Sequence, residues 1–265
     1  MPRENSNPSN EGKAPEGAEY IESLARGLRV IHNLGAIGRP TQLSNLAEAA
    51  NLPRATVRRI LLTLQRGGFV ETDGKLFWLT PRVLSLASAY LSSNQIVAVL
   101  QPMMDAVATE TREVCSMAIL DGFEAVFVAR ASPARVFSAG IDLGYRLPAF
   151  CSSVGRVLLG RMTNDELVRT LADAKLAPMT AYTMLDRDVL AARIISDRNK
   201  GYSLVDQEAE DGFRSIAVPV RRYDGAVVAA INVGSHVDRT STSEMIDRFL
   251  PPLQRAAASA QPLLL

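Results

Sequence analysis

Residues 41–79 decide the fold of this chain, and they read TQLSNLAEAANLPRATVRRILLTLQRGGFVETDGKLFWL. Thr41 is placed to cap a short amphipathic helix, which stops before Pro53 because proline lacks the N–H group that a helix interior needs. A second helix begins near Arg54 and ends at Gly67 and Gly68. The apolar residues at helical spacing in these two segments are Leu43, Leu46, Ala47, Ala50, Val57, Ile60, Leu61 and Leu64. Two short helices joined by a brief turn predict a helix-turn-helix.

The rest of this stretch predicts a β-hairpin. Residues 69–72 and 75–79 are strand-like runs, and the Asp73-Gly74 dipeptide between them favours a type I′ turn. A further helix precedes the motif, because apolar residues recur every three or four positions between Ile21 and Leu34. A helix-turn-helix followed at once by a hairpin is a winged helix-turn-helix.

Beyond residue 80 the chain alternates helices and strands. Two antiparallel hairpins are expected at 114–129 and 215–233, and helices near 152–160, 163–174, 186–200 and 242–260. Helices packed on a mixed sheet give the α+β class. We therefore expect a disordered tail (1–19), a winged helix-turn-helix DNA-binding domain (20–80), a helical linker (81–95) and a second domain (96–265).

Composition excludes several classes of protein. With 29 Lys and Arg against 28 Asp and Glu the formal charge is +1, which argues against a polycation that coats nucleic acid or membrane. The positive share is local, because residues 21–80 carry 8 basic and 4 acidic side chains. Only two cysteines, Cys115 and Cys151, exclude a disulfide-rich scaffold and predict a cytoplasmic protein. Neither a signal peptide nor an apolar run of roughly 20 residues is found, so no membrane partner is expected.

The second helix of the motif carries cations on the side opposite its apolar stripe. The residues that project from this side in its first turns are Arg54, Thr56, Arg58 and Arg59. Arginine can pair with guanine edges or phosphates in the major groove, and threonine can contact either. We expect these four residues to read DNA, with phosphate contacts from Ser23, Arg26, Thr41 and Lys75. The alternative that stays open is a solvated helix face.

Four stretches of the chain carry a resemblance to a known family. They are IESLARGL at 21–28, GYRLP at 144–148, SVGRVLL at 153–159 and GYSLVDQE at 201–208. Together with the winged motif, and in this order, they resemble the IclR-type transcriptional regulators over residues 20–260. The branch that they are most similar to is the PcaR, PcaU and PobR type, which regulates aromatic-acid catabolism through the β-ketoadipate pathway.

This resemblance implies a winged helix-turn-helix joined by a helical linker to a GAF-like α/β effector-binding domain. It implies a double-stranded DNA operator, a homodimer or homotetramer, a small-molecule effector and no cofactor or catalytic activity. Carried over position by position, the family's effector pocket falls on Ala139, Leu147, Ser153, Val154, Val205, Phe213, Ser215, Asn232 and Gly234. Three positions depart from a common family pattern, because Val205 replaces an acid, Ser215 a cysteine and Arg156 a lysine.

The residues themselves allow an anionic aromatic ligand. Ser152 and Ser153 begin a predicted helix, where free N–H groups and the helix dipole favour a carboxylate. Apolar side chains among the carried-over positions can wall a ring, while Ser215 and Asn232 can bond its substituents. Arg135 or Arg146 is a candidate counter-charge. We therefore predict an aromatic acid such as protocatechuate or 4-hydroxybenzoate, or a pathway dicarboxylate.

Other functions stay open at this stage. A hydrolase is disfavoured because Cys151 takes the place of the first glycine in a G-x-S-x-G elbow. The acids at 206–211 are more typical of a solvated face, with a partner in Arg214, than of a metal site. A redox switch through Cys115 and Cys151 lacks neighbouring basic residues that would lower a thiol pKa. A constitutive DNA-binding protein would leave the second domain without a role.

Overall fold

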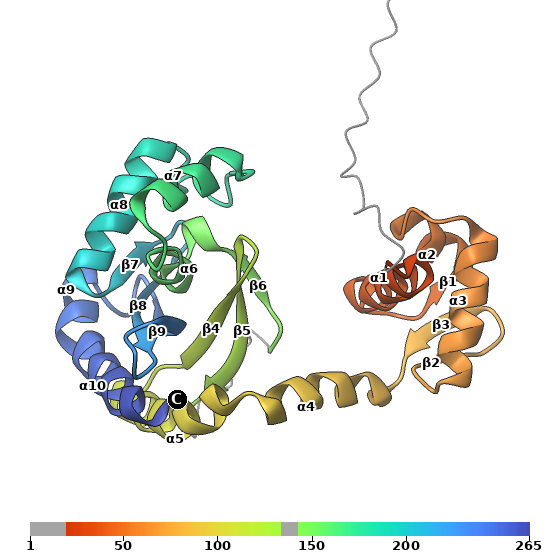
Figure 1. Ribbon diagram of the computed structural model, residues 1–265, viewed down its shortest axis with the longest axis horizontal. Helices are drawn as coiled ribbons and strands as arrows, with labels where there is room; N and C mark the ends of the chain where they lie inside the picture. Colours follow the sequence, from red (N-terminus) through yellow and green to blue (C-terminus); the bar gives the residue numbers. More distant parts are fainter. Residues whose placement is uncertain (1–19, 134–142) are drawn as a thin grey trace, which may run out of the picture. The chain divides into compact units, whose positions relative to one another are not determined.

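The computed structural model describes residues 20–133 and 143–265, and it divides them into two compact units that meet in the chain at Tyr90 and Leu91. Each unit contains both helices and strands (Figure 1), so the α+β class predicted from the sequence is confirmed. The predicted residues Arg135 and Ala139 lie outside the described residues.

The N-terminal unit is a winged helix-turn-helix. Its elements are α1 (Glu22–Ile37), β1 (Thr41–Gln42), α2 (Leu43–Ala49), α3 (Arg54–Arg66), β2 (Val70–Thr72) and β3 (Leu76–Leu79). The three helices pack around one core, whose fully buried members include Val30, Leu46 and Val57. The three strands form an antiparallel sheet in the order β1-β3-β2, and β2 and β3 are the wing.

Two local expectations in this unit were wrong. Thr41 does not cap α2: it is buried and pairs with Phe77 in the sheet, and the helix begins after Gln42 without a side-chain cap. The wing turn is longer than a two-residue type I′ turn, because Thr72 pairs with Phe77 and residues 73–76 separate these two paired positions. The Asp73 carboxylate organises this turn by accepting hydrogen bonds from the N–H groups of residues 75 and 76.

The apolar stripe of α1 is only partly buried. Val30 and Leu34 enter the core, and Gly38 ends the helix in the left-handed conformation. The earlier members of the stripe face outward: Ile21, Leu24 and Leu28 are 63%, 58% and 55% exposed. The predicted helix is therefore present, but its apolar face enters the core only in its second half.

Between the two predicted domains the chain is helical. A single 3₁₀ turn (Pro81–Val83) leads into α4 (Leu84–Ser93), and α5 (Gln95–Thr111) follows after Asn94, whose side chain accepts a hydrogen bond from the N–H of Ile96. No single described helix has the length and hydropathy needed to cross a membrane.

The C-terminal unit is built on a six-stranded antiparallel sheet in the order β6-β5-β4-β9-β8-β7. The strands are β4 (Cys115–Asp121), β5 (Glu124–Ala131), β6 (Arg146–Pro148), β7 (Ser203–Asp206), β8 (Phe213–Arg221) and β9 (Val227–His236). The helices after β6 are α6 (Ser153–Leu159), α7 (Asn164–Asp173), α8 (Arg187–Lys200), α9 (Thr242–Glu244) and α10 (Leu250–Ala260). Short 3₁₀ turns precede α6 (Ala149–Cys151) and follow α10 (Gln261–Leu263).

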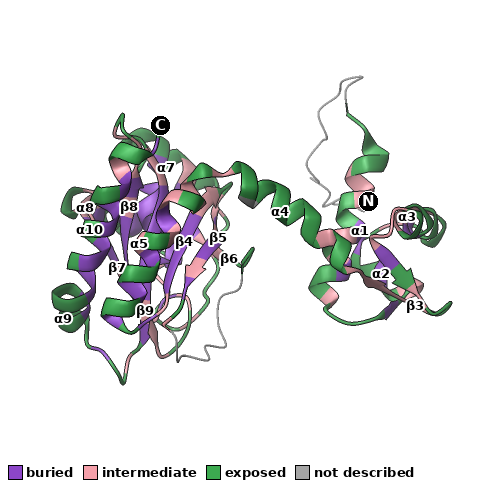
Figure 2. Ribbon diagram, turned by 90° about the horizontal axis from the view of Figure 1, so that it is seen from below, coloured by how far each residue is buried: buried purple, intermediate pink, exposed green. Residues whose placement is uncertain are grey.

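The two faces of this sheet differ in side-chain size, and the difference positions the site. Large residues such as Met117, Ile216 and Ile231 face α5 and α10, which cover one side (Figure 2). Small residues alternate with them and face α6: Ala118, Ala125, Ala217 and Ala230. Because these residues are small, α6 can lie close to the sheet. Gly155 brings α6 close to the preceding turn as well, since a Cβ there would stand 2.2 Å from the Ala149 oxygen.

The C-terminal helical segment is interrupted by a π-helical turn (Met245–Phe249) between α9 and α10. Pro251 and Pro252 follow this turn. Proline has no N–H and its ring crowds the preceding helical turn, so a widened turn before it avoids the clash.

Candidate functional site

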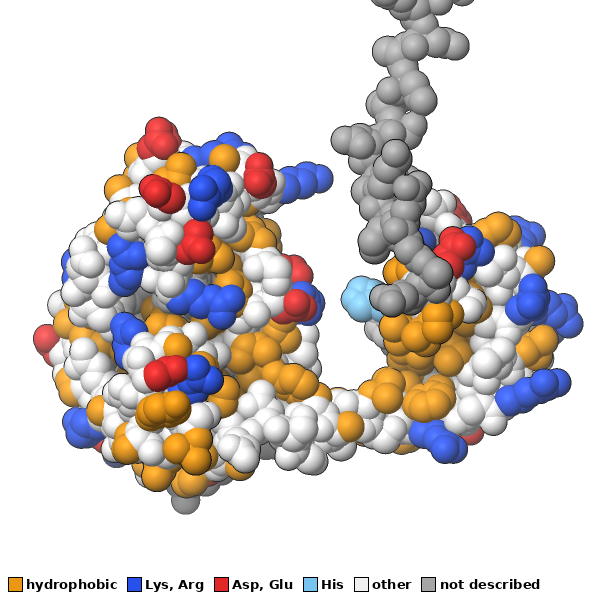
Figure 3. Space-filling model, viewed as in Figure 1, with side chains coloured by type: hydrophobic (Ala, Val, Ile, Leu, Met, Phe, Trp, Pro, Cys, Tyr) orange, Lys and Arg blue, Asp and Glu red, His pale blue; other side chains and the backbone are white. Residues whose placement is uncertain are grey.

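The outer side of α3 presents three arginines. Arg54, Arg58 and Arg59 are exposed, and within the described residues none of them forms an ion pair. Figure 3 shows Lys and Arg side chains along the side of the N-terminal unit formed by α3 and the wing, whereas hydrophobic side chains gather over α1. Exposed, unpaired guanidinium groups on one helix are available to phosphates and base edges.

Four of the predicted DNA contacts lie together. Ser23 and Arg26 of α1 line a groove of about 630 Å³ together with Thr56 and Arg59 of α3. Arg26 is held by an ion pair with Glu22. Lys75 is exposed in the wing turn, so it is free to reach a phosphate. Thr41 is the least suited of the eight residues, because it is only 6% exposed.

A cavity of about 50 Å³ lies in the C-terminal unit between the start of α6 and the sheet. Eight predicted effector positions line it: Leu147, Ser152, Ser153, Val154, Val205, Phe213, Ser215 and Asn232. A ninth, Gly234, lies beneath the Phe213 ring. Sequence reasoning did not predict five further lining residues, Phe127, Tyr145, Cys151, Ala209 and Glu210. Phe127 could have been predicted as a lining residue from strand periodicity, because it lies two residues after Ala125 in β5. The two side chains therefore share the face of the sheet that faces α6.

The floor of the cavity is polar and its walls are apolar. The Ser153 and Ser215 hydroxyls lie 2.7 Å apart and share a hydrogen bond. Asn232 is 7% exposed, and its Oδ1 has no hydrogen-bond partner in the described structure. Ser152 has a local role instead, because its hydroxyl accepts a hydrogen bond from the Gly155 N–H and donates one to the Pro148 oxygen.

The charge around the cavity differs from what we expected. Arg146 is not among the lining residues and binds the carboxylates of Asp121 and Glu124, each at 2.7 Å, so its proposed role as counter-charge was wrong. Among the described lining residues, Glu210 alone is charged, and it is exposed. Among the described lining residues, a ligand carboxylate would therefore be held by hydroxyl, amide and main-chain donors.

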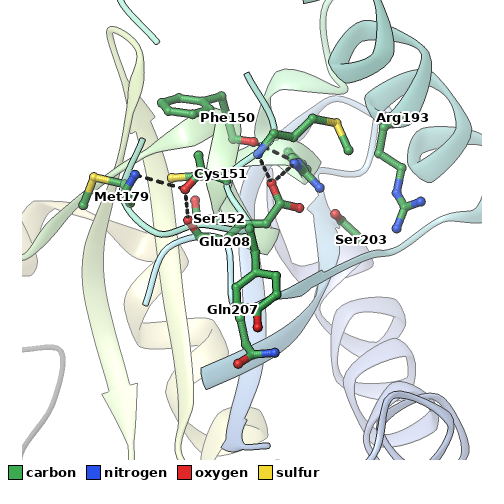
Figure 4. Close-up of polar contacts among 12 residues, drawn as sticks. Phe150, Cys151, Ser152, Met179, Arg193, Ser203, Gln207 and Glu208 are labelled. Carbon is green, nitrogen blue, oxygen red and sulfur yellow. Dashed lines mark hydrogen bonds and ion pairs between the residues drawn. The ribbon is translucent and has the colours of Figure 1, made fainter. Parts of the chain in front are cut away.

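A buried ion pair fixes the loop that closes one side of the cavity. Arg156 of α6 is fully buried, and its Nη2 lies 2.6 Å from Glu208 Oε2. The same carboxylate accepts a hydrogen bond from the Met184 N–H, while the Thr183 hydroxyl donates to the Glu208 main-chain oxygen. Figure 4 shows Glu208 and Gln207 pointing in opposite directions from this loop. The contacts join α6, the loop at 207–212 and the segment before α8.

Neither thiol is suited to redox switching. Cys115 and Cys151 are free and buried. Burial raises the pKa of the Cys115 thiol, and it raises the pKa of Cys151 to about 12. Both therefore stay protonated at neutral pH, whereas reactive cysteines are thiolates.

Two family descriptions match the chain. Residues 23–74 match "IclR helix-turn-helix domain", and residues 88–261 match "Bacterial transcriptional regulator IclR C-terminal". The "Pca regulon regulatory protein" of Pseudomonas putida is 40% identical over 240 residues, which cover 90% of this chain and 82% of the relative. The "p-hydroxybenzoate hydroxylase transcriptional activator" of Acinetobacter baylyi is 34% identical over 244 residues, or 90% of each protein.

Solved structures of other proteins have a similar fold. A crystal structure of a protein from Rhodococcus sp. RHA1 superposes with a TM-score of 0.81 at 40% identity, over 91% of this chain and 97% of the other. The inducer-binding domain of PobR from Acinetobacter, a double mutant in complex with 3-hydroxybenzoic acid, superposes with a TM-score of 0.60 at 31% identity. That comparison covers 63% of this chain and 98% of the PobR domain.

Proposed function

This chain belongs to the IclR family of bacterial transcriptional regulators, and from that premise we propose that it binds an operator through α3 and responds to an aromatic acid in the α6 cavity. One observation carries the effector half of the proposal: seven positions carried over from the family resemblance, together with Ser152 at the start of α6, line a single cavity with apolar walls and a polar floor. Such a combination is typical of small-molecule sites.

The effector that fits this chemistry is a hydroxylated benzoate such as 4-hydroxybenzoate or protocatechuate. Phe127, Leu147 and Phe213 offer apolar surface to a ring, and Ser153, Ser215 and Asn232 offer hydrogen bonds to its substituents. Two comparisons support this class, because one relative is named for p-hydroxybenzoate hydroxylase and the PobR domain was crystallised with 3-hydroxybenzoic acid. A dicarboxylate of the same pathway is the alternative, and it would use the polar floor without the ring contacts.

We further propose that the protein acts as a homodimer or homotetramer in the cytoplasm, with residues 81–95 as the linker. Leu84 and Leu86 of α4 are 66% and 52% exposed, so a second copy of the chain would remove apolar surface from water. A two-fold symmetric protein reads two half-sites of an operator. Effector binding shifts DNA affinity only as far as the effector binds the two conformations of the protein unequally.

Footprinting tests the two halves of the proposal together. DNA upstream of the neighbouring operon would be probed with the full-length protein, with and without 4-hydroxybenzoate or protocatechuate at 1 mM. We expect a protected region whose half-saturation changes with one of these compounds. The direction of that change distinguishes an activator-type from a repressor-type response.

Thermal unfolding provides the independent readout for the effector. A ligand at about 1,000 times its Kd stabilises the native state by about 4.1 kcal/mol, so a micromolar binder gives a clear rise in Tm at 1 mM. Absence of any rise with the hydroxybenzoates and with the pathway dicarboxylates contradicts the effector class. An unprotected upstream region contradicts the operator assignment.

A further inference from the structure

A glycine in the central part of the sheet holds an aromatic ring of the cavity in place. Gly234 of β9 pairs with Ser215 of β8, and Phe213 lies two residues before Ser215 on the same face of its strand. A Cβ built on Gly234 would stand 2.4 Å from Cζ and 2.6 Å from Cε1 of Phe213. No side chain tolerates such an approach, so the ring occupies its position only because residue 234 is glycine.

The arrangement is a diagonal cross-strand contact. Aromatic side chains reach a diagonal neighbour across an antiparallel pair, and an aromatic ring over a strand glycine covers main chain that would otherwise be exposed. A glycine inside a strand often marks a place where another group must come close. Here the group is the Phe213 ring, which also lines the cavity beside Val205 and Ser215.

From this contact we infer that Phe213, seated on Gly234, limits the size of the pocket and restricts the effector to a single ring. The inference rests on the proposed function, since it concerns the size of the effector in the same cavity. The cavity of about 50 Å³ is small beside the ~150 Å³ that an engineered core cavity offers to benzene. Even one ring therefore requires neighbouring side chains to move outward, and a fused second ring would need in addition the space that the Phe213 ring fills.

Two substitutions act on this contact in opposite ways. Phe213→Ala removes a phenyl ring and opens space close to that of the second ring of a naphthalene. Gly234→Ala places a Cβ inside the present ring position, so the Phe213 ring must move. The double variant Phe213→Ala with Gly234→Ala has no ring for the new Cβ to meet, and it should behave like Phe213→Ala alone.

Isothermal titration calorimetry with the full-length chain tests the inference, using 4-hydroxybenzoate and 6-hydroxy-2-naphthoate as probes. The wild type should bind 4-hydroxybenzoate and exclude the naphthoate. Phe213→Ala should bind the naphthoate at least ~10-fold more tightly than the wild type does, and Gly234→Ala should weaken 4-hydroxybenzoate by ~10-fold or more, the size of an overpacking penalty. The double variant should recover naphthoate binding to the level of Phe213→Ala. This rescue separates a steric contact from a general loss of fold, because a merely structural glycine would not be rescued by a second truncation.

The matched control is Phe123→Ala, which removes a ring that stacks on Phe150 and does not line the cavity. It should leave naphthoate exclusion intact. Phe213→Leu retains apolar volume next to the glycine and provides a second variant if the alanine form does not fold by circular dichroism; it should relax exclusion of the naphthoate to a smaller extent. Wild-type binding of 4-hydroxybenzoate without a naphthoate gain in either Phe213 variant overturns this inference and leaves the proposed function standing. A wild type that binds neither probe overturns the effector class itself.

Discussion

Glu208 and Arg156 form an ion pair inside the C-terminal unit, and Arg156 is completely buried. The sequence suggested a solvated run of acids at 206–211, with Arg214 as a partner. Asp206 does pair with Arg214, at 3.0 Å, but Glu208 turns inward. Among the described residues no group of three His, Cys, Asp or Glu side chains is arranged to hold a metal ion. Since the partner of Glu208 is 52 residues away in the chain, local patterning could not show that this acid is buried.

The buried pair predicts an asymmetric response to mutation. Glu208→Ala should lower the free energy of unfolding by about 3–5 kcal/mol, because it leaves the Arg156 charge without a partner in the interior. Replacing both residues, as Arg156→Met with Glu208→Leu, should cost less than the single change. Urea denaturation measures each value. The control is Arg146→Ala, which breaks an exposed pair that is worth ~0–1 kcal/mol. Equal losses for Glu208→Ala and Arg146→Ala would contradict the assigned role.

At the scale of helices and strands, periodicity predicted where the elements lie better than it predicted how they pair and pack. It located α3, which begins at Arg54 as expected, and both long hairpins of the C-terminal unit. It missed β6 and β7, because strands of three and four residues carry too few alternations to stand out without a turn signal such as the Asp73-Gly74 dipeptide that identified the equally short β2 and β3. It also placed Thr41 at a helix cap, whereas tertiary pairing with Phe77 draws this residue into the sheet.

The candidate pocket was predictable only in part, for a related reason. Positions such as Ser153 and Phe213 came from a resemblance, and the structure brings them to one cavity. The contacts that shape the cavity, such as the Phe213 ring over Gly234, join strands whose register is a property of the folded sheet. The position of the Arg146 side chain depends on its ion pairs with Asp121 and Glu124. Both carboxylates are more than 20 residues away in the chain, so residue spacing could not predict these pairs.

The proposed role of α3 in reading DNA can be tested at Arg58. Arg58→Ala should weaken binding to the footprinted operator by about 1–3 kcal/mol if its guanidinium pairs with a base edge, because the partner base then loses a bidentate contact. Fluorescence anisotropy at fixed salt measures the affinity for operator and for a scrambled duplex. Arg161→Ala, an exposed arginine of the C-terminal unit, removes the same charge elsewhere and should change neither value appreciably. A loss of the same size on both duplexes would assign Arg58 to a phosphate, and an unchanged operator affinity would remove it from the interface.

At the scale of the whole molecule, charge and apolar surface are divided between different segments. Residues 21–80 carry 8 basic and 4 acidic side chains, whereas the complete chain has a net charge of only +1. A small module of this charge can make only a few phosphate contacts, so the proposed homodimer would gain affinity by presenting two such modules to the operator. We expect the two copies to meet at the exposed apolar side of α4, a helix of 10 residues that is too short to be stable without packing.

Disrupting that side of α4 should therefore separate copies of the chain and weaken DNA binding together. Leu84→Glu combined with Leu86→Glu places two charges where apolar side chains are 66% and 52% exposed in the single chain. We expect a lower weight-average mass in sedimentation equilibrium and an operator affinity reduced by ~100-fold or more, since binding through two linked half-sites is lost. Val189→Glu is the matched control, because Val189 is also 52% exposed but lies on α8. If the double variant keeps the wild-type mass and operator affinity, α4 is not the interface, and the exposed stripe of α1 becomes the next surface to test by the same two measurements.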